Sequence, residues 1–414
     1  MKVTELYLRN FRNIAEARLV PDTKLNFLIG QNGQGKTSFL EALGYLATFR
    51  SFRGARSDEV MAWGEYATEI GCKLASEEGS GWETELKISF NGQDEKREKV
   101  AKTAFINGKP FKSPTAYLSQ RFGAFELGVH AVIFNPADHD LVRGEPAGRR
   151  SFLDRVIAAE NVQYLKTSAK YHRTVSQRNA LLKSALKSGQ PPSRDLLAGF
   201  TEQMGTLAAQ ITYKRLEWVL KLSDRLNDTA HQIAPEQGHL RLIYLSNWIP
   251  QIDGLVFNNN NLSSLHFTGH GHLPSLNLLE RFFWNKLNLL EAAELRSGHS
   301  LVGPHRDDWA FYLGSQALRG HGSQGEVRSA LLALKLCEID LFRIETGHRP
   351  LFLLDDFSSE LDRERRAFLL RFLSESDLQT FVTTTEDPAF LGKKFRVSRG
   401  SLIHVATESA ECSE

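Results

Sequence analysis

A glycine-rich segment near the start of the chain has the composition and spacing needed to hold a phosphate chain. It follows the apolar run 25–29, precedes a stretch of helical periodicity, and consists of Gly30, Gln31, Asn32, Gly33, Gln34, Gly35, Lys36 and Thr37. Glycines let backbone N–H groups curl around phosphate oxygens, and a helix start adds its positive dipole end. The lysine of such a loop neutralises β- and γ-phosphate charge, and the hydroxyl binds Mg²⁺. We therefore predict that this segment binds ATP with Mg²⁺.

Two adjacent carboxylates follow a second apolar run far along the chain. Residues 351–354 read Leu-Phe-Leu-Leu, which is typical of a parallel strand covered on both faces, and Asp355 and Asp356 come next. Ligands of such sheets bind at the carboxyl ends of the strands, so both carboxylates should lie near the phosphate loop. We predict that Asp355 binds Mg²⁺ together with Thr37, and that Asp356 orients the water that attacks the terminal phosphate.

A third motif begins the helix expected at about residues 326–345. Its sequence, Ser323-Gln324-Gly325-Glu326, resembles the S-x-G-[EQ] signature of ABC ATPases. Because Lys36 already occupies the chain's own phosphate site, we predict that Ser323 and Gly325 contact the γ-phosphate held by a second copy of the chain. The turn 359–362 is similar to an ABC D-loop and adds Asp362 to the nucleotide ligands. Taken alone, the Asp-Asp pair and the signature sequence are ordinary caps or turns, whereas the three motifs in this order along the chain are much more specific.

The elements that must position these residues indicate an α/β fold interrupted by helices. Strand-like runs with one helix fill about the first 130 residues, and helical periodicity then extends from Arg149 to Lys187 and, after a break at 189–193, from Phe200 to Leu222. The two helical stretches are expected to pack as a hairpin. Strand patterns return after residue 301. We predict a P-loop ATPase head with halves at 1–148 and 299–414, and an inserted mainly α-helical second lobe at 149–298.

The charge of the chain is balanced overall but biased locally. Lys and Arg number 51 against 49 Asp and Glu, so the net charge of +2 provides no general attraction to nucleic acid. Between residues 143 and 187, however, ten basic residues accompany three acidic ones. Such a segment can bind phosphates without reading bases, or can pair with other parts of the protein. The candidate DNA contacts are Arg149, Arg150, Arg173 and Arg178.

The composition argues against several other classes of protein. The three cysteines are far apart, and no apolar run reaches membrane-spanning length, so we expect a cytoplasmic protein without a membrane partner. His266, His270 and His272 have no acidic or thiol neighbour at ligand spacing. We therefore interpret their segment as a loop and not as a metal site.

The chain resembles the RecF family from residue 2 to about residue 406, most weakly over 230–280. The resemblance rests on motifs at 8–13 (LRNFRN), 30–38 (GQNGQGKTS), 134–138 (FNPAD), 144–154, 171–183, 302–308 (VGPHRDD), 321–326 (HGSQGE) and 353–362 (LLDDFSSELD). It implies an ABC-type head with a helical second lobe, ATP-driven homodimers, and binding to single-stranded, duplex or gapped DNA. It also implies roles in recombinational repair, replication-gap processing and the SOS response, with a RecR-type mediator as partner.

Two positions differ from the wider ABC class. Asp356 stands where a glutamate is usual, and Thr383-Thr384-Thr385 stands where a switch histidine is common. At both positions the chain resembles the RecF family, and this resemblance implies that ATP hydrolysis is slow and stimulated by DNA.

Other classes of ATPase share these motifs but differ in the length of chain between them. An SMC or Rad50-like protein needs hundreds of heptad residues between its halves, and a transporter ATPase has a much shorter interval than that from Lys36 to Ser323. A module that recruits partners without productive hydrolysis is the alternative that stays open. Phosphate release measured with and without DNA distinguishes it from an ATPase.

Overall fold

The chain folds into two compact units. The computed structural model describes residues 2–75, 83–92, 100–120, 129–252, 256–257, 273–357, 361–388 and 390–404. The first unit consists of Met1–Asp138 with Phe342–Glu414, and the second is His139–Leu341. The predicted boundaries of the insertion, 149 and 298, differ from this division, because residues 299–341 and the signature motif fall in the second unit.

Strand pairing and a buried ion pair hold residues 308–313 in the second unit. Strand β11 (Asp308–Leu313) pairs antiparallel with β9 (Leu240–Leu245) along its whole length. Asp308 also forms an ion pair of 2.7 Å with the buried Arg149. Both contacts join segments far apart in sequence, which periodicity along the chain does not reveal.

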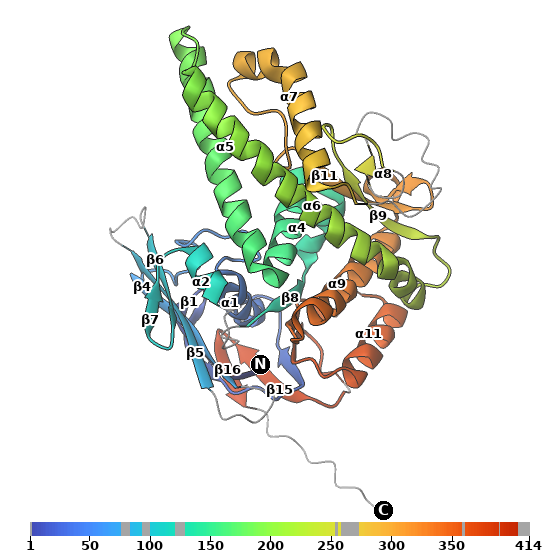
Figure 1. Cartoon of the computed structure of the whole chain (residues 1–414). Coiled ribbons are helices and arrows are strands. Elements are labelled where there is room, and N and C mark those ends of the chain that lie inside the picture. Colours follow the sequence, from blue (N-terminus) through green and yellow to red (C-terminus); the bar gives the residue numbers. More distant parts are fainter. Residues whose placement is uncertain are drawn as a thin grey trace, which may run out of the picture. The chain divides into compact units, whose positions relative to one another are not determined.

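The first unit contains a mainly parallel sheet that carries the phosphate loop (Figure 1). Its strand order is β16-β15-β3-β14-β13-β8, and all but β16 run parallel. The strand β13 is buried throughout, as its apolar run predicted, and β3 is buried throughout as well, including Asn26. The bounds are β3 Leu25–Ile29, β8 Ala131–Phe134, β13 Leu351–Leu354, β14 Thr380–Thr384, β15 Lys393–Ser398 and β16 Ser401–His404. The ends of β3, β13 and β14 therefore meet at one edge of the sheet.

The remaining strands of the first unit form an antiparallel sheet of their own, in the order β2-β1-β4-β5-β6-β7. The bounds are β1 Lys2–Phe11, β2 Ile14–Leu19, β4 Ala67–Ala75, β5 Glu83–Gly92, β6 Val100–Ile106 and β7 Lys109–Phe111. One core joins both sheets to the buried face of α1 (Lys36–Thr48). The prediction of one helix before residue 130 is wrong, because α2 (Pro114–Gln120) is a second. The helix α11 (Arg363–Glu375) completes the unit.

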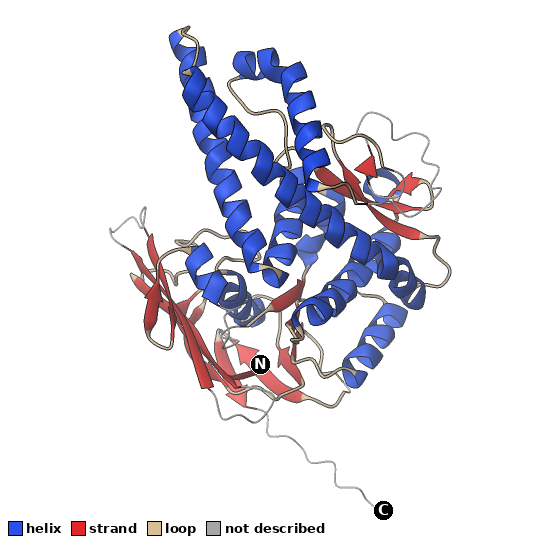
Figure 2. Ribbon diagram, viewed as in Figure 1, coloured by secondary structure: helices blue, strands red, loops and turns tan. Residues whose placement is uncertain are grey.

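The second unit is mostly helical, with a small sheet in the order β10-β9-β11-β12 (Figure 2). The helices α5 and α6 pack as the predicted hairpin, and α6 buries Met204, Ile211 and Trp218. The bounds are α3 Asp140–Arg143, α4 Pro146–Glu160, α5 Val162–Ser188, α6 Arg194–Ile233, β10 Val256–Phe257, α7 Leu276–Ser297, β12 Gln316–Ala317, α8 Leu318–His321 and α9 Gln324–Thr346, the last of which ends in the first unit. The short helix η1 (Pro136–His139) belongs to the first unit except for His139. Within the described ranges, no helix combines the length and the apolar character needed to cross a bilayer.

Candidate nucleotide-binding site

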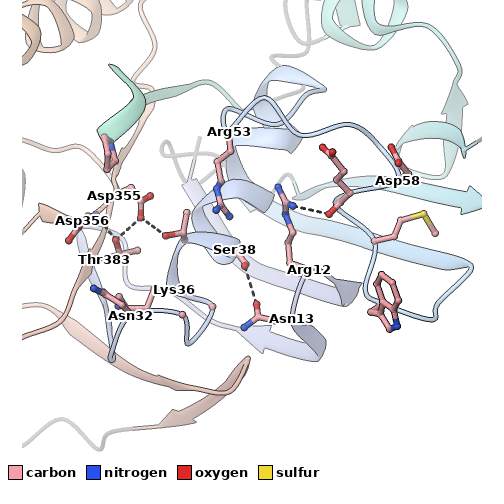
Figure 3. A pocket seen from close by; sticks show the side chains of 17 residues that line it. Arg12, Asn13, Asn32, Lys36, Ser38, Arg53, Asp58, Asp355, Asp356 and Thr383 are labelled. Carbon is pink, nitrogen blue, oxygen red and sulfur yellow. Dashed lines mark hydrogen bonds between the residues drawn. The ribbon is translucent and has the colours of Figure 1, made fainter. Parts of the chain in front are cut away.

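The first unit contains a cavity of about 870 Å³ at the edge where β3, β13 and β14 end. Its walls include the phosphate loop and, next to it, Asp355 and Asp356, as Figure 3 shows. Residues 12–13, residues between Arg53 and Trp63, and Ser38, Pro136 and Thr383 also line it. A volume of this size suits a ligand as large as a nucleotide.

The phosphate loop depends on backbone conformations that glycine adopts easily. Gly33 and Gly35 have φ angles of 77° and 104°, a region that other residues rarely enter. A Cβ at Gly35 would also lie 2.9 Å from the side chain of Asn13. The chain then enters α1 at Lys36. The N–H groups at the start of this helix have no partner four residues earlier, and they form an anion site at the mouth of the cavity.

Lys36 lies against the loop that it closes. Its Nζ donates hydrogen bonds to the carbonyl oxygens of Gly30, at 2.6 Å, and Gln31, at 3.0 Å. Burial lowers the pKa of Lys36, while the charges of Asp356 and Asp355 act in the opposite direction. An anion bound at the loop would offset this loss of solvation, so the ammonium group is placed for phosphate.

Asp355, directly after β13, links the start of α1 to the end of β14. Its Oδ1 accepts hydrogen bonds from the hydroxyls of Thr37 and Thr383, each at 2.8 Å, and the Thr383 hydroxyl accepts one from the backbone N–H of Asp356 at 2.8 Å. Burial is the main cause that raises the pKa of Asp355. Asp356 has a φ of 54°, which is uncommon for a residue with a side chain. The fold thus brings Thr37 to within hydrogen-bond distance of a carboxylate 318 residues away in sequence.

Two arginines at the cavity were missed as site residues by the motif analysis. Arg12 donates to both oxygens of the fully buried Glu41, at 2.9 and 2.6 Å. Arg53 lies 3.6 Å from the same carboxylate, which also accepts a hydrogen bond of 2.5 Å from Ser51. One buried carboxylate on α1 therefore holds two guanidinium groups at the cavity. Nothing local in the sequence marks Glu41 as their shared partner.

Comparison with known proteins identifies the kind of chain that carries this site. The family model described as the RecF/RecN/SMC N terminal domain matches residues 2–399. A DNA replication and repair protein RecF from Geobacter metallireducens is 34% identical, over 97% of this chain and 99% of the relative. The Geobacter sulfurreducens protein of that name is 32% identical, over 98% and 100%. The chain belongs to the RecF family.

Solved structures agree with this family and with the predicted fold. A structure of the recombination mediator protein RecF with ATP, from the RecFOR pathway, has a TM-score of 0.82 at 28% identity and covers 98% of both chains. An Smc head domain from Pyrococcus furiosus has a TM-score of 0.53 at 14% identity, which is a likeness of fold alone. The predicted ABC-type ATPase head with a mainly helical insertion is confirmed.

Most of the predicted phosphate-site residues of this RecF-family chain lie together. The cavity wall contains Asn32, Gly33, Gly35, Lys36, Thr37, Asp355 and Asp356. Gly30 and Gln31 contribute the carbonyls that hold Lys36. Gln34 does not line the cavity but bonds to the turn at 399–400. Its side-chain and backbone oxygens accept hydrogen bonds from the backbone N–H groups of Arg399 and Gly400, respectively.

The signature and D-loop residues are found at helix starts. Ser323 and Glu326 exchange hydrogen bonds with each other's backbone N–H groups, which is the capping box of α9. Ser323 is nevertheless exposed at the surface of the second unit, and Gly325 is half-buried. Asp362 caps α11 by accepting from the backbone N–H of Arg365. In the rest of the D-loop, Ser359 and Glu360 lie outside the described residues.

Two of the four arginines predicted to contact DNA are buried, and that prediction is wrong for them. Arg149 is 2% exposed in its ion pair with Asp308. Arg178 is 3% exposed and bonds Glu294 at 2.6 Å, Ser300 at 2.7 Å and Thr201 at 2.9 Å. Each guanidinium is enclosed by partners from distant parts of the second unit, so neither is available to DNA.

The other two predicted DNA contacts keep some exposure. Arg150 is half-buried and donates to the carbonyl oxygen of Asp307 at 2.9 Å. Arg173 is exposed on α5. The predicted absence of a histidine metal site at 266–272 falls outside the described residues. In the ranges that are described, no three His, Cys, Asp or Glu side chains gather in a way suited to a metal ion.

Proposed function

We propose that this chain is an ATP-dependent DNA-binding protein of recombinational repair that binds ATP and Mg²⁺ in the cavity of its first unit. The observation that carries the proposal is the convergence of Lys36, Thr37 and Asp355 at one sheet edge. A related solved structure is that of RecF with ATP, and the loop that would receive the phosphates here has the order Gly30 to Lys36 and Thr37 expected of a phosphate loop. A family partner of the RecR type and the SOS response belong to the same proposal.

The residues present fit Mg²⁺. Thr37 and Asp355 offer hydroxyl and carboxylate oxygens 2.8 Å apart, and Mg²⁺ usually takes one or two protein oxygens together with phosphates and water. Among the described residues, no cation lies at hydrogen-bond distance from Asp355, and burial is the main cause that raises the pKa of its carboxyl. When bound, the ion would neutralise charge on the phosphates. Thr37 and Asp355 would hold it, and Thr383 would orient the Asp355 carboxylate.

Dimerisation is proposed to bring Ser323 of one copy to the γ-phosphate bound by the other. Ser323→Arg should therefore block the dimer that forms with ATP while leaving ATP binding by the monomer nearly unchanged, because the arginine fills the space meant for phosphate. Size-exclusion chromatography with ATP and with ADP measures the change. Ser275→Arg is the matched control, because Ser275 caps α7 and loses a comparable hydrogen bond. A Ser323→Arg chain that still dimerises would refute contact across the dimer.

Asp356 is proposed to orient the attacking water. Asp356→Asn should slow phosphate release by about 100-fold, with ATP affinity close to the wild-type value, because the phosphate cradle is untouched. The exposed Asp377→Asn change in the same unit is the control, since that carboxylate takes part in surface ion pairs with Lys24 and Arg349. If the Asp356→Asn chain releases phosphate at the wild-type rate, another group orients the attacking water.

DNA binding is tested by comparing the affinity of the wild-type chain for single-stranded, duplex and gapped DNA with ATP and with ADP. A joint surface formed by two copies predicts tighter binding with ATP, because phosphate contacts from both chains add within one complex. The alternative, a partner-recruiting module without productive hydrolysis, predicts that DNA leaves the rate of phosphate release unchanged.

A further inference from the structure

A groove of about 560 Å³ in the second unit is separate from the nucleotide cavity. It lies along α5 and α6, which run side by side in Figure 1. Nine of its ten lining residues are polar or glycine, and the tenth is Leu207. The volume suits one small ligand, and the lining suits a polar one.

The charge of the groove comes from α5. Lys166 and Lys170 line it, one helical turn apart, and both are exposed. The ammonium group of neither lysine forms an ion pair or a hydrogen bond with another residue in the described ranges. Arg173 continues the same face of α5 and is likewise exposed. Glu202 is the one acidic residue in the described lining, so the two lysines leave a net positive charge.

The α6 side adds groups that bind base edges or sugars. Gln203 and Gln210 line it, and Gln163 faces them from α5. The carbonyl oxygen of Gln203 accepts a hydrogen bond of 2.6 Å from Thr174, which leaves its NH₂ group as a donor. Gly199 has nothing within 4 Å of where a Cβ would stand, so the absence of a side chain keeps the groove open.

We propose that this groove binds a nucleotide unit of single-stranded DNA, with Lys166 and Lys170 on the phosphates and the glutamine amides on the base. The proposal rests on the proposed DNA-binding function and names its site. A duplex presents its bases paired and stacked, whereas a single strand can turn a base into a groove of this size. Because phosphate contacts dominate, the affinity should depend strongly on salt and weakly on base sequence.

The first test removes the two lysines. Lys166→Gln/Lys170→Gln should weaken the binding of a fluorescent oligothymidylate to the ATP-bound protein by about tenfold or more. The slope of log affinity against log salt should become shallower by about 1.4, or about 0.7 for each phosphate that is no longer neutralised. Lys183→Gln/Lys187→Gln is the matched control. It removes the same charge from exposed positions on α5, about 20 Å beyond Lys170 along the helix and outside the screening length. Equal losses of affinity in both variants would overturn the proposal.

The second test fills the groove without changing charge. Gly199→Leu also raises helix propensity, so a folding defect is not expected. It should reduce oligothymidylate affinity by about fivefold while the affinity for the matching duplex changes less. Gly148→Leu in α4, where a Cβ again meets nothing within 4 Å, is the control.

Three further outcomes count against the proposal in different ways. If the Gly199→Leu and lysine variants bind DNA with the wild-type affinity, the groove is not the DNA site, although the protein still binds DNA. That result is expected if the groove holds a protein partner. A wild-type chain that binds no DNA with ATP would overturn both the groove and the proposed function. Binding of free dTMP as tightly as the oligothymidylate would assign the groove to a mononucleotide.

Discussion

Lys36→Ala should reduce ATP affinity by about 100-fold or more, because the change removes a partly desolvated cation from the place where the phosphates bind. Lys36 is 8% exposed, and its Nζ bonds only to the carbonyls of Gly30 and Gln31 in the described structure. Neither carbonyl carries a full charge, so the ammonium group gains most from a bound triphosphate. Calorimetric titration with ATP and Mg²⁺ measures the loss of affinity.

A second lysine of the same unit supplies the control. Lys24→Ala removes an exposed ammonium group whose carboxylate partner, Asp377, is 4.0 Å away, and it should bind ATP as the wild type does. Thermal unfolding without nucleotide checks that Lys36→Ala leaves the loop folded. ATP binding at wild-type affinity by the Lys36→Ala chain would place the nucleotide somewhere other than the phosphate loop.

Arg178→Ala should destabilise the helical part of the second unit by about 3–5 kcal/mol, because it leaves Glu294 as a buried charge without its partner. The exposed fractions of the two side chains are 3% and 2%, and within the described ranges the carboxylate of Glu294 retains only the backbone N–H of Leu301, at 2.6 Å. Since the chain has two compact units, hydrogen exchange of peptides from α5, α6 and α7 is a better measure than one unfolding transition.

Arg173→Ala, five residues earlier on α5, is the matched control. Its side chain is exposed, so the same substitution should change the stability by no more than about 0.5 kcal/mol. The double variant Arg178→Ala/Glu294→Ala should recover part of the stability, because the uncompensated carboxylate is removed as well. Equal exchange in the Arg178→Ala and Arg173→Ala chains would mean that the buried pair contributes nothing to stability.

A loss of DNA affinity has a different cause in the Arg178 variant than in the Arg173 variant. A loss of DNA affinity in Arg178→Ala would reflect a disturbed helical hairpin, whereas a loss in Arg173→Ala would reflect a missing surface cation. A loss of DNA affinity on substitution of Arg149 would also reflect a structural change, because its guanidinium is held by Asp308 and the carbonyl of Gly144. Surface variants on α5 are therefore the ones that test DNA contact.

The sequence by itself determined the elements whose signals are local. The unbroken apolar run 351–354 predicted β13 as a buried strand, and the mostly apolar run 25–29 predicted β3 as a strand. Helical spacing predicted the α5–α6 hairpin, because burial on one stripe is visible in neighbouring residues. The phosphate loop was predicted for the same reason, since its glycines, lysine and threonine act within one turn between a strand and a helix.

Only the tertiary structure decided which distant residues meet. Arginines are alike in sequence, yet Arg178 is buried because Glu294, 116 residues away, lies opposite it, while Arg173 faces solvent. Glu41 likewise gains its importance from Arg12 and Arg53, and residues 308–313 belong to the second unit because β11 pairs with β9. Ion pairs and strand pairs between remote segments depend on how the chain returns on itself, and no pattern along one segment contains that information.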